Sequence, residues 1–319
     1  MTVPHLDAEE VRGRLPILAA VEALEEALRA GLDPEAELPR AVVEVRGGAL
    51  LVMPSAAAAH PVVKLVTIGG RPRVQGVCVA FDGETLAPRA IVDGVAVTTL
   101  RTSAVSALAV RHLAVQQARR LLVLGRGPQA QAHAEAVRAV RPIEHIDMLG
   151  RDDGSRVAAA VAAADVICCC TTAREPLFDG AHVADHAAVI AIGSHEPEAR
   201  EVDDVLAARA TVVVESSASA LREAGDVVLA VRAGALRADE LMPLAAVVRG
   251  ESVPAPGRPR LFKSTGMAWE DAVTVDALLR ASGSRARAMR PRLRWVSGSR
   301  AAVFTFRAGA SGGRRRARG

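Results

Sequence analysis

The chain has 319 residues, half of them apolar, and is long enough for two domains with a sizeable core. Aromatic residues make up only 2% and Tyr is absent, so valine, leucine and alanine must form that core. We find no secretory leader pattern and no apolar run of about 20 residues, which argues against secretion and membrane spanning, and we expect a cytoplasmic protein.

The net charge of +4 comes from one end of the chain. Residues 281–319 hold eleven arginines and no Lys, Asp or Glu, and removing these eleven from the forty basic residues leaves 29 against 36 acidic ones. A basic tail can contact nucleic acid. Its Gly-, Ser- and Arg-rich end, 309–319, lacks aromatic residues, so we expect a disordered tail and no nucleic-acid partner.

The four cysteines predict neither a metal site nor a disulfide. Cys168 to Cys170 are adjacent in an apolar segment and Cys78 stands alone, a spacing that suits neither zinc nor a disulfide framework. We expect reduced thiols packed inside the protein.

Apolar residues at helical spacing predict helix from Leu6 to Leu32, with Pro16 beginning a second piece. From Arg40 onward the apolar residues recur at every second position instead of at helical spacing. This indicates strands joined by hairpin turns at Gly47–Gly48 and Asp82–Gly83, namely Ala41–Val45, Ala49–Met53, Val62–Ile68, Gly76–Phe81 and Ala90–Val92. With a following helix, Thr98–Ala114, these elements predict an antiparallel α+β region.

The segment from Leu121 to Val137 carries the clearest motif. A short apolar strand is followed by a GxGxxA turn and an alanine-rich helix. Gly125 permits the tight turn, Gly127 lets a pyrophosphate approach the backbone, and Ala130 keeps the helix close to the strand. This arrangement predicts a dinucleotide site.

Strands and helices alternate through the rest of this region. The predicted strands are Ile143–Leu149, Asp165–Cys170, Ala188–Ile192 and Ala210–Glu215, and the predicted helices are Ser155–Ala163, Ser217–Glu223 and Asp239–Val248. A loop, Pro254–Arg260, leads through Leu261–Ser264 to a last helix, Met267–Leu279. The alternation indicates an α/β fold with a Rossmann-type doubly wound parallel sheet.

The end of the second strand of this sheet bears on the choice of cofactor. An acidic residue there binds the ribose 2′-hydroxyl and selects NAD. Here Gly150 takes that position and Arg151 follows, and an arginine would bind a 2′-phosphate. We therefore favour NADP(H); NAD(H) stays open because Asp152 lies close enough to substitute.

Only two of the forty basic residues are lysine, Lys64 and Lys263. An arginine cannot give up its proton at working pH, whereas a lysine can once its environment lowers its pKa. Each lysine is therefore a candidate for proton chemistry. The alternative is that the two lysines are present only by chance.

Several motifs together resemble the ornithine cyclodeaminase/mu-crystallin family. They are VMP at Val52–Pro54, Lys64, RTSAVSALA at Arg101–Ala109, GRGPQA at 125–130, AGD at Ala224–Asp226, PGR at Pro256–Arg258 and FKSTGMAWED at Phe262–Asp271. The resemblance runs from about residue 3 to 279. It implies a homodimer, a nicotinamide cofactor and a small α-amino, α-imino or α-keto acid as substrate. It also implies an α+β substrate and dimerisation domain, 1–114 with 263–280, beside a Rossmann domain, 115–262.

The resemblance places the substrate's carboxylate on Arg40, Lys64 and Arg101, since the distances of Arg40 and Lys64 from Pro54 match the family pattern. Guanidinium groups suit bidentate recognition of a carboxylate, and Lys64 can serve as carboxylate ligand or proton donor. Surface or helix-cap ion pairs are the alternative for the two arginines. Cofactor contacts are implied for Gly125, Gly127, Pro128, Gln129, Ala130, Arg151, Thr171, Thr172 and Gly193.

One position departs from the pattern of the ornithine cyclodeaminases. These enzymes place a proton-handling aspartate two residues after the glycine that ends a late strand, and here that position, after Gly193, is His195. A histidine, with an unperturbed pKa of about 6.5, could still shuttle a proton. The alternative is that His195 only shapes the pocket.

The interpretation we favour is NAD(P)H-dependent reduction of a cyclic ketimine acid, Δ1-pyrroline-2-carboxylate or Δ1-piperideine-2-carboxylate, to L-proline or L-pipecolate. The reaction needs a carboxylate clamp, a hydride and one proton, and does not need the aspartate. Ornithine cyclodeaminase, an alanine or N-alkyl-amino-acid dehydrogenase, and an NADP(H)-binding protein without catalysis, as in the crystallin branch, stay open. Loss of Lys64 or of the arginines would favour the last, and all of them are present.

Overall fold

The computed structural model describes residues 3–283. Residues 1–2 and 284–319 lie outside the described part, and with them almost all of the predicted basic tail. The last helix, α10 (Ala268–Gly283), extends over the first three residues that we had assigned to this tail.

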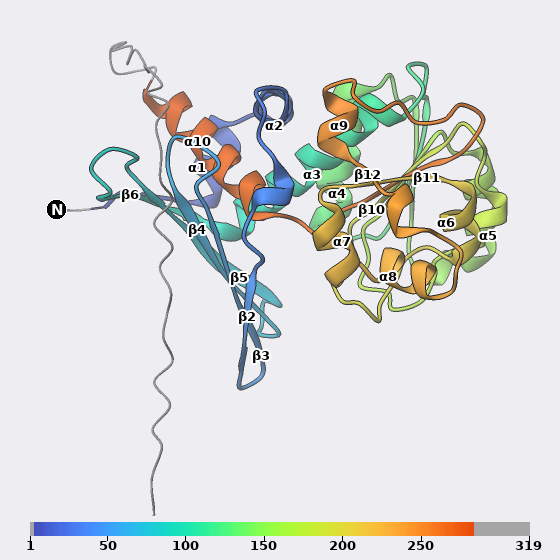
Figure 1. The fold of residues 1–319 in the computed structure, drawn as a ribbon, viewed down its shortest axis with the longest axis horizontal. Coiled ribbons are helices and arrows are strands. Elements are labelled where there is room, and N and C mark those ends of the chain that lie inside the picture. Colours follow the sequence, from blue (N-terminus) through green and yellow to red (C-terminus); the bar gives the residue numbers. More distant parts are fainter. Residues whose placement is uncertain (1–2, 284–319) are drawn as a thin grey trace, which may run out of the picture. The chain divides into compact units, whose positions relative to one another are not determined.

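Six strands from the N-terminal part form one sheet in the order β1-β6-β5-β4-β3-β2 (Figure 1). Five of them match the predicted strands to within two residues. The bounds are β1 His5–Leu6, β2 Ala41–Val45, β3 Gly48–Ser55, β4 Val62–Ile68, β5 Val74–Phe81 and β6 Pro88–Asp93. β2 to β6 pair in antiparallel fashion, as predicted.

At one edge of this sheet the prediction is wrong, because β1 pairs with β6 in parallel. Leu6 had been assigned to a helix. The helix begins only at Ala8, since the Asp7 side chain accepts hydrogen bonds from the backbone N–H groups of Glu9 and Glu10 and caps it. A strand of two residues is too short to show a period in the sequence.

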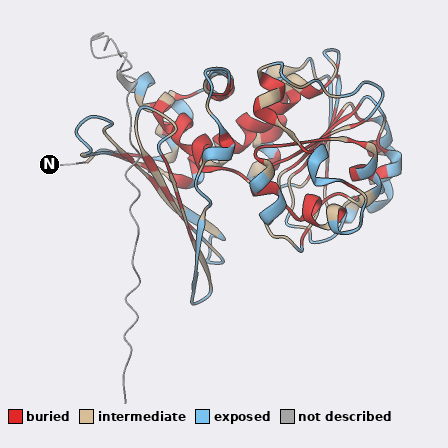
Figure 2. Cartoon of the chain, viewed as in Figure 1, coloured by how far each residue is buried: buried red, intermediate tan, exposed pale blue. Residues whose placement is uncertain are grey.

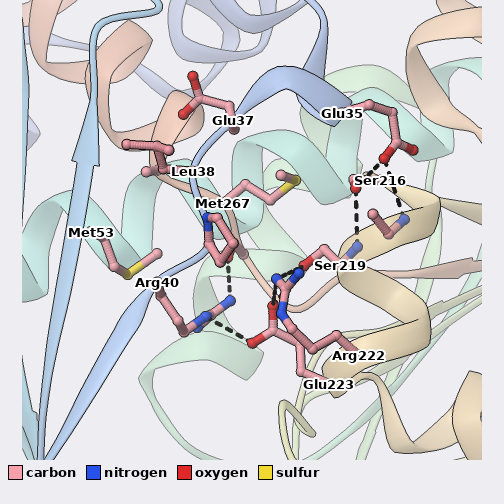
Figure 3. Close-up of a pocket in the computed structure, with 14 residues that line it drawn as sticks. Glu35, Glu37, Leu38, Arg40, Met53, Ser216, Ser219, Arg222, Glu223 and Met267 are labelled. Atoms are coloured by element: carbon pink, nitrogen blue, oxygen red, sulfur yellow. Dashed lines mark hydrogen bonds and ion pairs between the residues drawn. The ribbon is translucent and has the colours of Figure 1, made fainter. Parts of the chain in front are cut away.

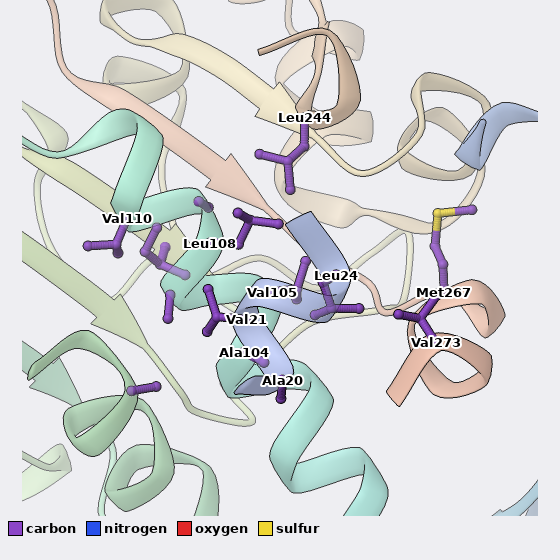
Figure 4. Packing of buried hydrophobic residues seen from close by; sticks show 14 of the residues in the cluster. Ala20, Val21, Leu24, Ala104, Val105, Leu108, Val110, Leu244, Met267 and Val273 are labelled. Carbon is purple, nitrogen blue, oxygen red and sulfur yellow. The ribbon is translucent and has the colours of Figure 1, made fainter. Parts of the chain in front are cut away.

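Helices α3 (Gly94–Leu113) and α10 pack against this sheet and against each other. Helices α1 (Ala8–Arg14) and α2 (Ile17–Arg29), separated at Pro16 as predicted, also pack on α3 and α10. Fully buried side chains, among them Leu24, Leu108 and Trp269, fill the space between them. Figure 4 shows Leu24 and Leu108 in this cluster, and Figure 2 colours the buried parts of the chain red.

The second sheet is parallel, in the order β12-β11-β13-β10-β9-β7-β8. The bounds are β7 Arg120–Leu124, β8 His145–Leu149, β9 Val166–Cys169, β10 Ala188–Ala191, β11 Thr211–Val214, β12 Met242–Pro243 and β13 Arg260–Lys263. From β7, the first strand of this sheet along the chain, the order runs outward to β8 on one side and to β9 and β10 on the other. This confirms the doubly wound Rossmann-type sheet. Residue 263 ends β13, so it lies in the parallel sheet and not in the first domain, where we had placed it.

Six helices accompany this sheet: α4 Pro128–Val140, α5 Gly154–Ala163, α6 Asp204–Arg209, α7 Ser217–Glu223, α8 Gly225–Arg232 and α9 Leu244–Val248. α6 and α8 were not predicted. The predicted helix Asp239–Val248 is confirmed only in its second half, the short α9, because a 3-10 turn and β12 occupy its first half and Pro243 precedes α9.

Cys78, Cys168 and Cys169 are fully buried, Cys170 is half-buried, and all four are free. No helix within residues 3–283 is both long and apolar enough to cross a bilayer. In the same part of the chain, His, Cys, Asp and Glu side chains do not gather in a group that could hold a metal ion.

Candidate functional site

The glycine turn between β7 and α4 leaves room for a phosphate. Gly125 has φ +130°, and a Cβ there would lie 2.5 Å from the carbonyl oxygen of Cys170, so this position requires glycine. Gly127 faces open space, with nothing within 4 Å of where its Cβ would be. The turn therefore fits the pyrophosphate of a dinucleotide at the start of α4.

Two predicted cofactor residues follow this turn. Pro128 is exposed in the first turn of α4, and Ala130 is buried. Between them, Oε1 of Gln129 is buried and has no hydrogen-bond partner among the described residues. This oxygen is free to accept a hydrogen bond from a ligand.

A single carboxylate connects the loops that follow β9 and β10. Glu201 accepts hydrogen bonds from the backbone N–H of Thr171 (2.9 Å), from its hydroxyl (2.7 Å) and from the N–H of Gly193 (2.7 Å). Burial raises the pKa of Glu201 to about 7. Thr171 and Gly193 thus lie close together at the carboxyl ends of neighbouring strands, and Thr172 beside them is exposed.

The second lysine, Lys263, anchors the same loops. Its ammonium group lies 2.7 Å from Asp226 Oδ2 and donates to the carbonyl of Ser194 at 2.7 Å, and both charged side chains are fully buried. Asp226 also accepts hydrogen bonds from the backbone N–H groups of Glu201 and Val202. Lys263 is therefore engaged in holding a loop, which removes the reason to assign it proton chemistry.

The first lysine belongs to a buried cluster of opposite charges. Lys64, on β4, lies 2.6 Å from Asp271 Oδ2, and the other Asp271 oxygen lies 3.3 Å from Nε of Arg101. Arg101 Nη1 also lies 2.6 Å from Glu270. Burial lowers the pKa of Lys64, the Arg101 charge adds to this effect, and Asp271 opposes it.

Arg40 lies at the wall of a pocket of about 230 Å³ (Figure 3). Its Nε is 2.9 Å from Glu223, and Nη2 donates to the carbonyls of Thr265 (2.9 Å) and Gly266 (2.6 Å). The pocket is also lined by Met53, Met267, Leu38, Ser219 and Arg222.

Gly266 lies against both Arg40 and Arg101. It has φ +77°, and any Cβ at this position would overlap the Arg101 guanidinium. Its carbonyl accepts from Arg40, and its N–H donates to Glu215 at 3.0 Å. The structure therefore brings Arg40 and Arg101 against the same glycine, and Asp271 links Arg101 to Lys64.

His195 is half-buried in the loop after β10. Burial lowers its pKa, the positive charge of Arg40 lowers it further, and Glu196 opposes both. Arg151 begins a 3-10 turn, Arg151–Asp153, at the end of β8, and its side chain lies outside the described part of the structure.

The profile of the ornithine cyclodeaminase/mu-crystallin family matches residues 4–160 and 154–281. The chain belongs to this family. It is 33% identical over 301 residues to the ketimine reductase mu-crystallin of Rattus norvegicus, covering 85% of this chain and 94% of the relative.

Two further members support this assignment. The chain is 30% identical over 295 residues to Δ1-pyrroline-2-carboxylate reductase 2 of Burkholderia ambifaria, covering 84% and 93% of the two chains. The structure of Thermococcus litoralis Δ1-pyrroline-2-carboxylate reductase, solved with NADH and L-proline, has a TM-score of 0.81 at 24% identity and covers 91% of this chain and 100% of that one. At this identity the last match supports the shared fold.

The structure brings three acidic residues to the site that we had not singled out from the sequence. Glu270 and Asp271 end the FKSTGMAWED motif, but we had given them no role. Glu215 follows β11 and accepts hydrogen bonds from Ser264 and from the next two backbone N–H groups, fixing the loop at Gly266. The sequence contained one indication of Glu215, because the predicted strand Ala210–Glu215 ends at it. Acidic residues at the carboxyl end of a buried parallel strand lie where such sheets bind ligands.

Proposed function

We propose that this protein reduces a cyclic ketimine acid, Δ1-pyrroline-2-carboxylate or Δ1-piperideine-2-carboxylate, to L-proline or L-pipecolate with NAD(P)H. Relatives that are 30% and 33% identical are named as reductases of this chemistry. The observation that carries the proposal is the buried Lys64 ammonium beside Arg101, which Gly266 connects to Arg40. This arrangement supports a carboxylate clamp with an adjacent proton donor.

The cofactor site fits a nicotinamide dinucleotide, because Gly127 is open and the Gln129 oxygen lacks a partner among the described residues. When bound, the nicotinamide supplies the hydride that the ketimine carbon receives. Glu201 holds Thr171 and Gly193 in fixed positions at this edge of the sheet.

Arg40 and Arg101 bind the substrate's carboxylate in this proposal, because a guanidinium donates charge-assisted hydrogen bonds to such a group. Burial and the neighbouring Glu215 carboxylate raise the pKa of Glu270. Burial opposes the charge of Arg101, but its ion pairs with Glu270 and Asp271 raise its pKa and keep the guanidinium positive.

Lys64 donates the proton that the ring nitrogen needs when the C=N bond is reduced. Its lowered pKa makes the ammonium a stronger acid than an exposed lysine. His195 is the less suitable donor, because burial and Arg40 lower its pKa and favour the neutral imidazole near pH 7. We assign His195 to shaping the pocket.

We further propose NADP(H) as the preferred cofactor. β8 ends at Leu149, and Gly150 after it brings no carboxylate for the ribose 2′-hydroxyl and is followed by Arg151. A cytoplasmic location is consistent with free buried cysteines and with use of a reduced nicotinamide pool.

A homodimer is the assembly we propose, through the open face of the six-stranded sheet. On β4 the buried Val62, Lys64 and Val66 alternate with half-buried residues. One of these, Leu65, lies in register between Val52 and Val77 on the face away from the helices. A row of apolar side chains on an open sheet face is typical of a subunit interface.

The dimer is tested by light scattering of the Leu65→Glu variant. We expect the wild-type protein to have twice the chain's mass and the variant to have the mass of one chain. The control is Val253→Glu, which changes a valine that is 80% exposed and should leave the mass unchanged. A wild-type monomer would contradict the proposal.

The reaction is tested by following nicotinamide absorbance with the purified protein. NADPH or NADH is offered with each cyclic ketimine acid, or with pyruvate plus ammonia or methylamine, and L-ornithine is tested separately for ammonia release. We expect cofactor oxidation with a cyclic ketimine. Absence of that activity together with ammonia release from ornithine would instead establish a cyclodeaminase with His195 in place of the aspartate.

A further inference from the structure

The end of β8 is covered by an arginine from the glycine turn itself. The guanidinium of Arg126, between Gly125 and Gly127, lies over the Cα of Gly150. A Cβ built on Gly150 would be 3.3 Å from both Cζ and Nε of Arg126 and 3.4 Å from Nη1. The backbone of Gly150, with φ −116°, would accept any residue, so the arginine and not the backbone fills the side-chain position there.

This position is the one from which an acidic residue reaches the ribose 2′-hydroxyl in NAD-binding Rossmann folds. Here the volume that such a carboxylate would occupy holds a positive charge instead. Arg126 is exposed over 58% of its side chain, so it is accessible to a ligand that lies along this edge of the sheet.

Asp153 is the counter-ion of Arg126 and fixes its direction. It forms an ion pair with Arg126 and accepts a hydrogen bond from the Gly150 N–H at 2.9 Å. Arg156 lies 3.4 Å from the other Asp153 oxygen. Asp153 therefore faces two arginines, Arg126 and Arg156. A 2′-phosphate on the ribose of NADP(H) would meet the Arg126 guanidinium already aligned over Gly150.

We propose that Arg126 selects NADP(H) by binding the 2′-phosphate over Gly150, with Asp153 holding the guanidinium in place. The inference rests on the proposed cofactor and goes further, since the sequence had pointed to Arg151. A guanidinium presents paired donors to a phosphate, whereas the 2′-hydroxyl of NAD(H) offers it only a weak partner.

The test uses two fragments that differ only in the 2′-phosphate, 2′,5′-ADP and 5′-AMP, titrated calorimetrically into the full chain. For Arg126→Ala we expect the affinity for 2′,5′-ADP to fall about tenfold or more, the scale for losing a charged hydrogen bond, and that for 5′-AMP to stay within about twofold. The matched control is Arg156→Ala, which removes the other arginine on Asp153 and should change neither affinity.

A second variant tests the same site in the opposite sense. Gly150→Asp places a second carboxylate beside the exposed Arg126 guanidinium, and we expect it to weaken 2′,5′-ADP binding and spare 5′-AMP. Equal losses of both fragments in Arg126→Ala, or no loss, would overturn the inference, the latter leaving the phosphate to Arg151. A wild-type chain that binds both fragments equally would refute NADP(H) preference as well, while ketimine reduction with NADH would still stand.

Discussion

The ammonium nitrogen of Lys64 lies 2.6 Å from Oδ2 of Asp271, and both side chains are almost completely buried. The other Asp271 oxygen lies 3.3 Å from Nε of Arg101. One carboxylate thus fixes the proposed proton donor and a proposed carboxylate ligand relative to each other. It also opposes the fall in the pKa of Lys64 that burial and the Arg101 charge cause.

Replacing Lys64 tests its role as proton donor. We expect Lys64→Ala to abolish turnover of the ketimine acid and to leave NADPH affinity within a few fold, because the lysine lies outside the glycine turn. Lys64→Arg should also be inactive, since arginine keeps the charge but does not release its proton. Stopped-flow turnover and cofactor titration measure the two effects, and a fully active alanine variant would show that Lys64 is not the donor.

The same role predicts a pH dependence. The protonated form of Lys64 is the active one, so the rate should fall as pH rises through the pKa of Lys64. Because that pKa is lowered, the fall begins below the value of about 10.4 for an exposed lysine. An Asp271→Asn variant removes the group that raises the pKa, and we expect the alkaline limb of its kcat/KM profile to move to lower pH. An unmoved limb would assign that ionisation to another group.

Arg40 is expected to act mainly in binding. Arg40→Ala removes a charged hydrogen-bond donor from the pocket and should raise the KM for the ketimine acid about tenfold or more. The control is Arg222→Ala, which alters an arginine of the same pocket that is 44% exposed and pairs with Glu223. If both variants raise KM equally, the effect reflects loss of charge in the pocket and not a specific contact from Arg40.

The regular elements were predictable where local patterning determines them. β3 to β6 alternate more and less buried residues along most of their length, and the β7 turn needs glycine at a positive φ, so both leave a clear pattern in the sequence. Elements defined by tertiary pairing were missed. β13 runs for only four residues, and it lies between β10 and β11 because of strand order, which no local period reports.

In the site, the cations were predictable and their partners were not. Lys64 stood out in a chain that otherwise uses arginine, and Arg40 matched a family spacing. Asp271 and Glu270 occur in the first turn of a helix, where acidic residues are ordinary surface residues. Only the packing of α10 against β4 and α3 buries them beside Lys64 and Arg101.

The Lys263–Asp226 pair should contribute strongly to stability. Asp226→Asn preserves a carbonyl oxygen for the N–H groups of Glu201 and Val202 but leaves the Lys263 charge buried without its counter-ion. Removing one partner of such a pair costs about 3–5 kcal/mol, so we expect a loss on that scale in the free energy of unfolding by urea. Arg237→Ala, which breaks a surface pair with Asp239, is the control and should have no measurable effect. A similarly small change for Asp226→Asn would mean that the two charges are not needed together.

Glu201 should make stability depend on pH in the opposite direction to an ordinary paired carboxylate. Its pKa is about 7 in the folded protein, above the 4.5 of an exposed glutamate. Between these values the folded state holds a proton that the unfolded state has released. The contribution of this group is therefore greatest below about pH 4.5 and is lost as pH rises toward 7.

Glu201→Gln imitates the protonated side chain and has no such titration. We expect the wild-type protein to lose stability relative to this variant between pH 5 and pH 7, by up to about 1.4 kcal/mol per pH unit, the limit for one proton. Urea unfolding of both proteins across this range measures the difference. A constant difference would mean that Glu201 stays ionised throughout, with its three hydrogen bonds to Thr171 and Gly193 outweighing the cost of burial.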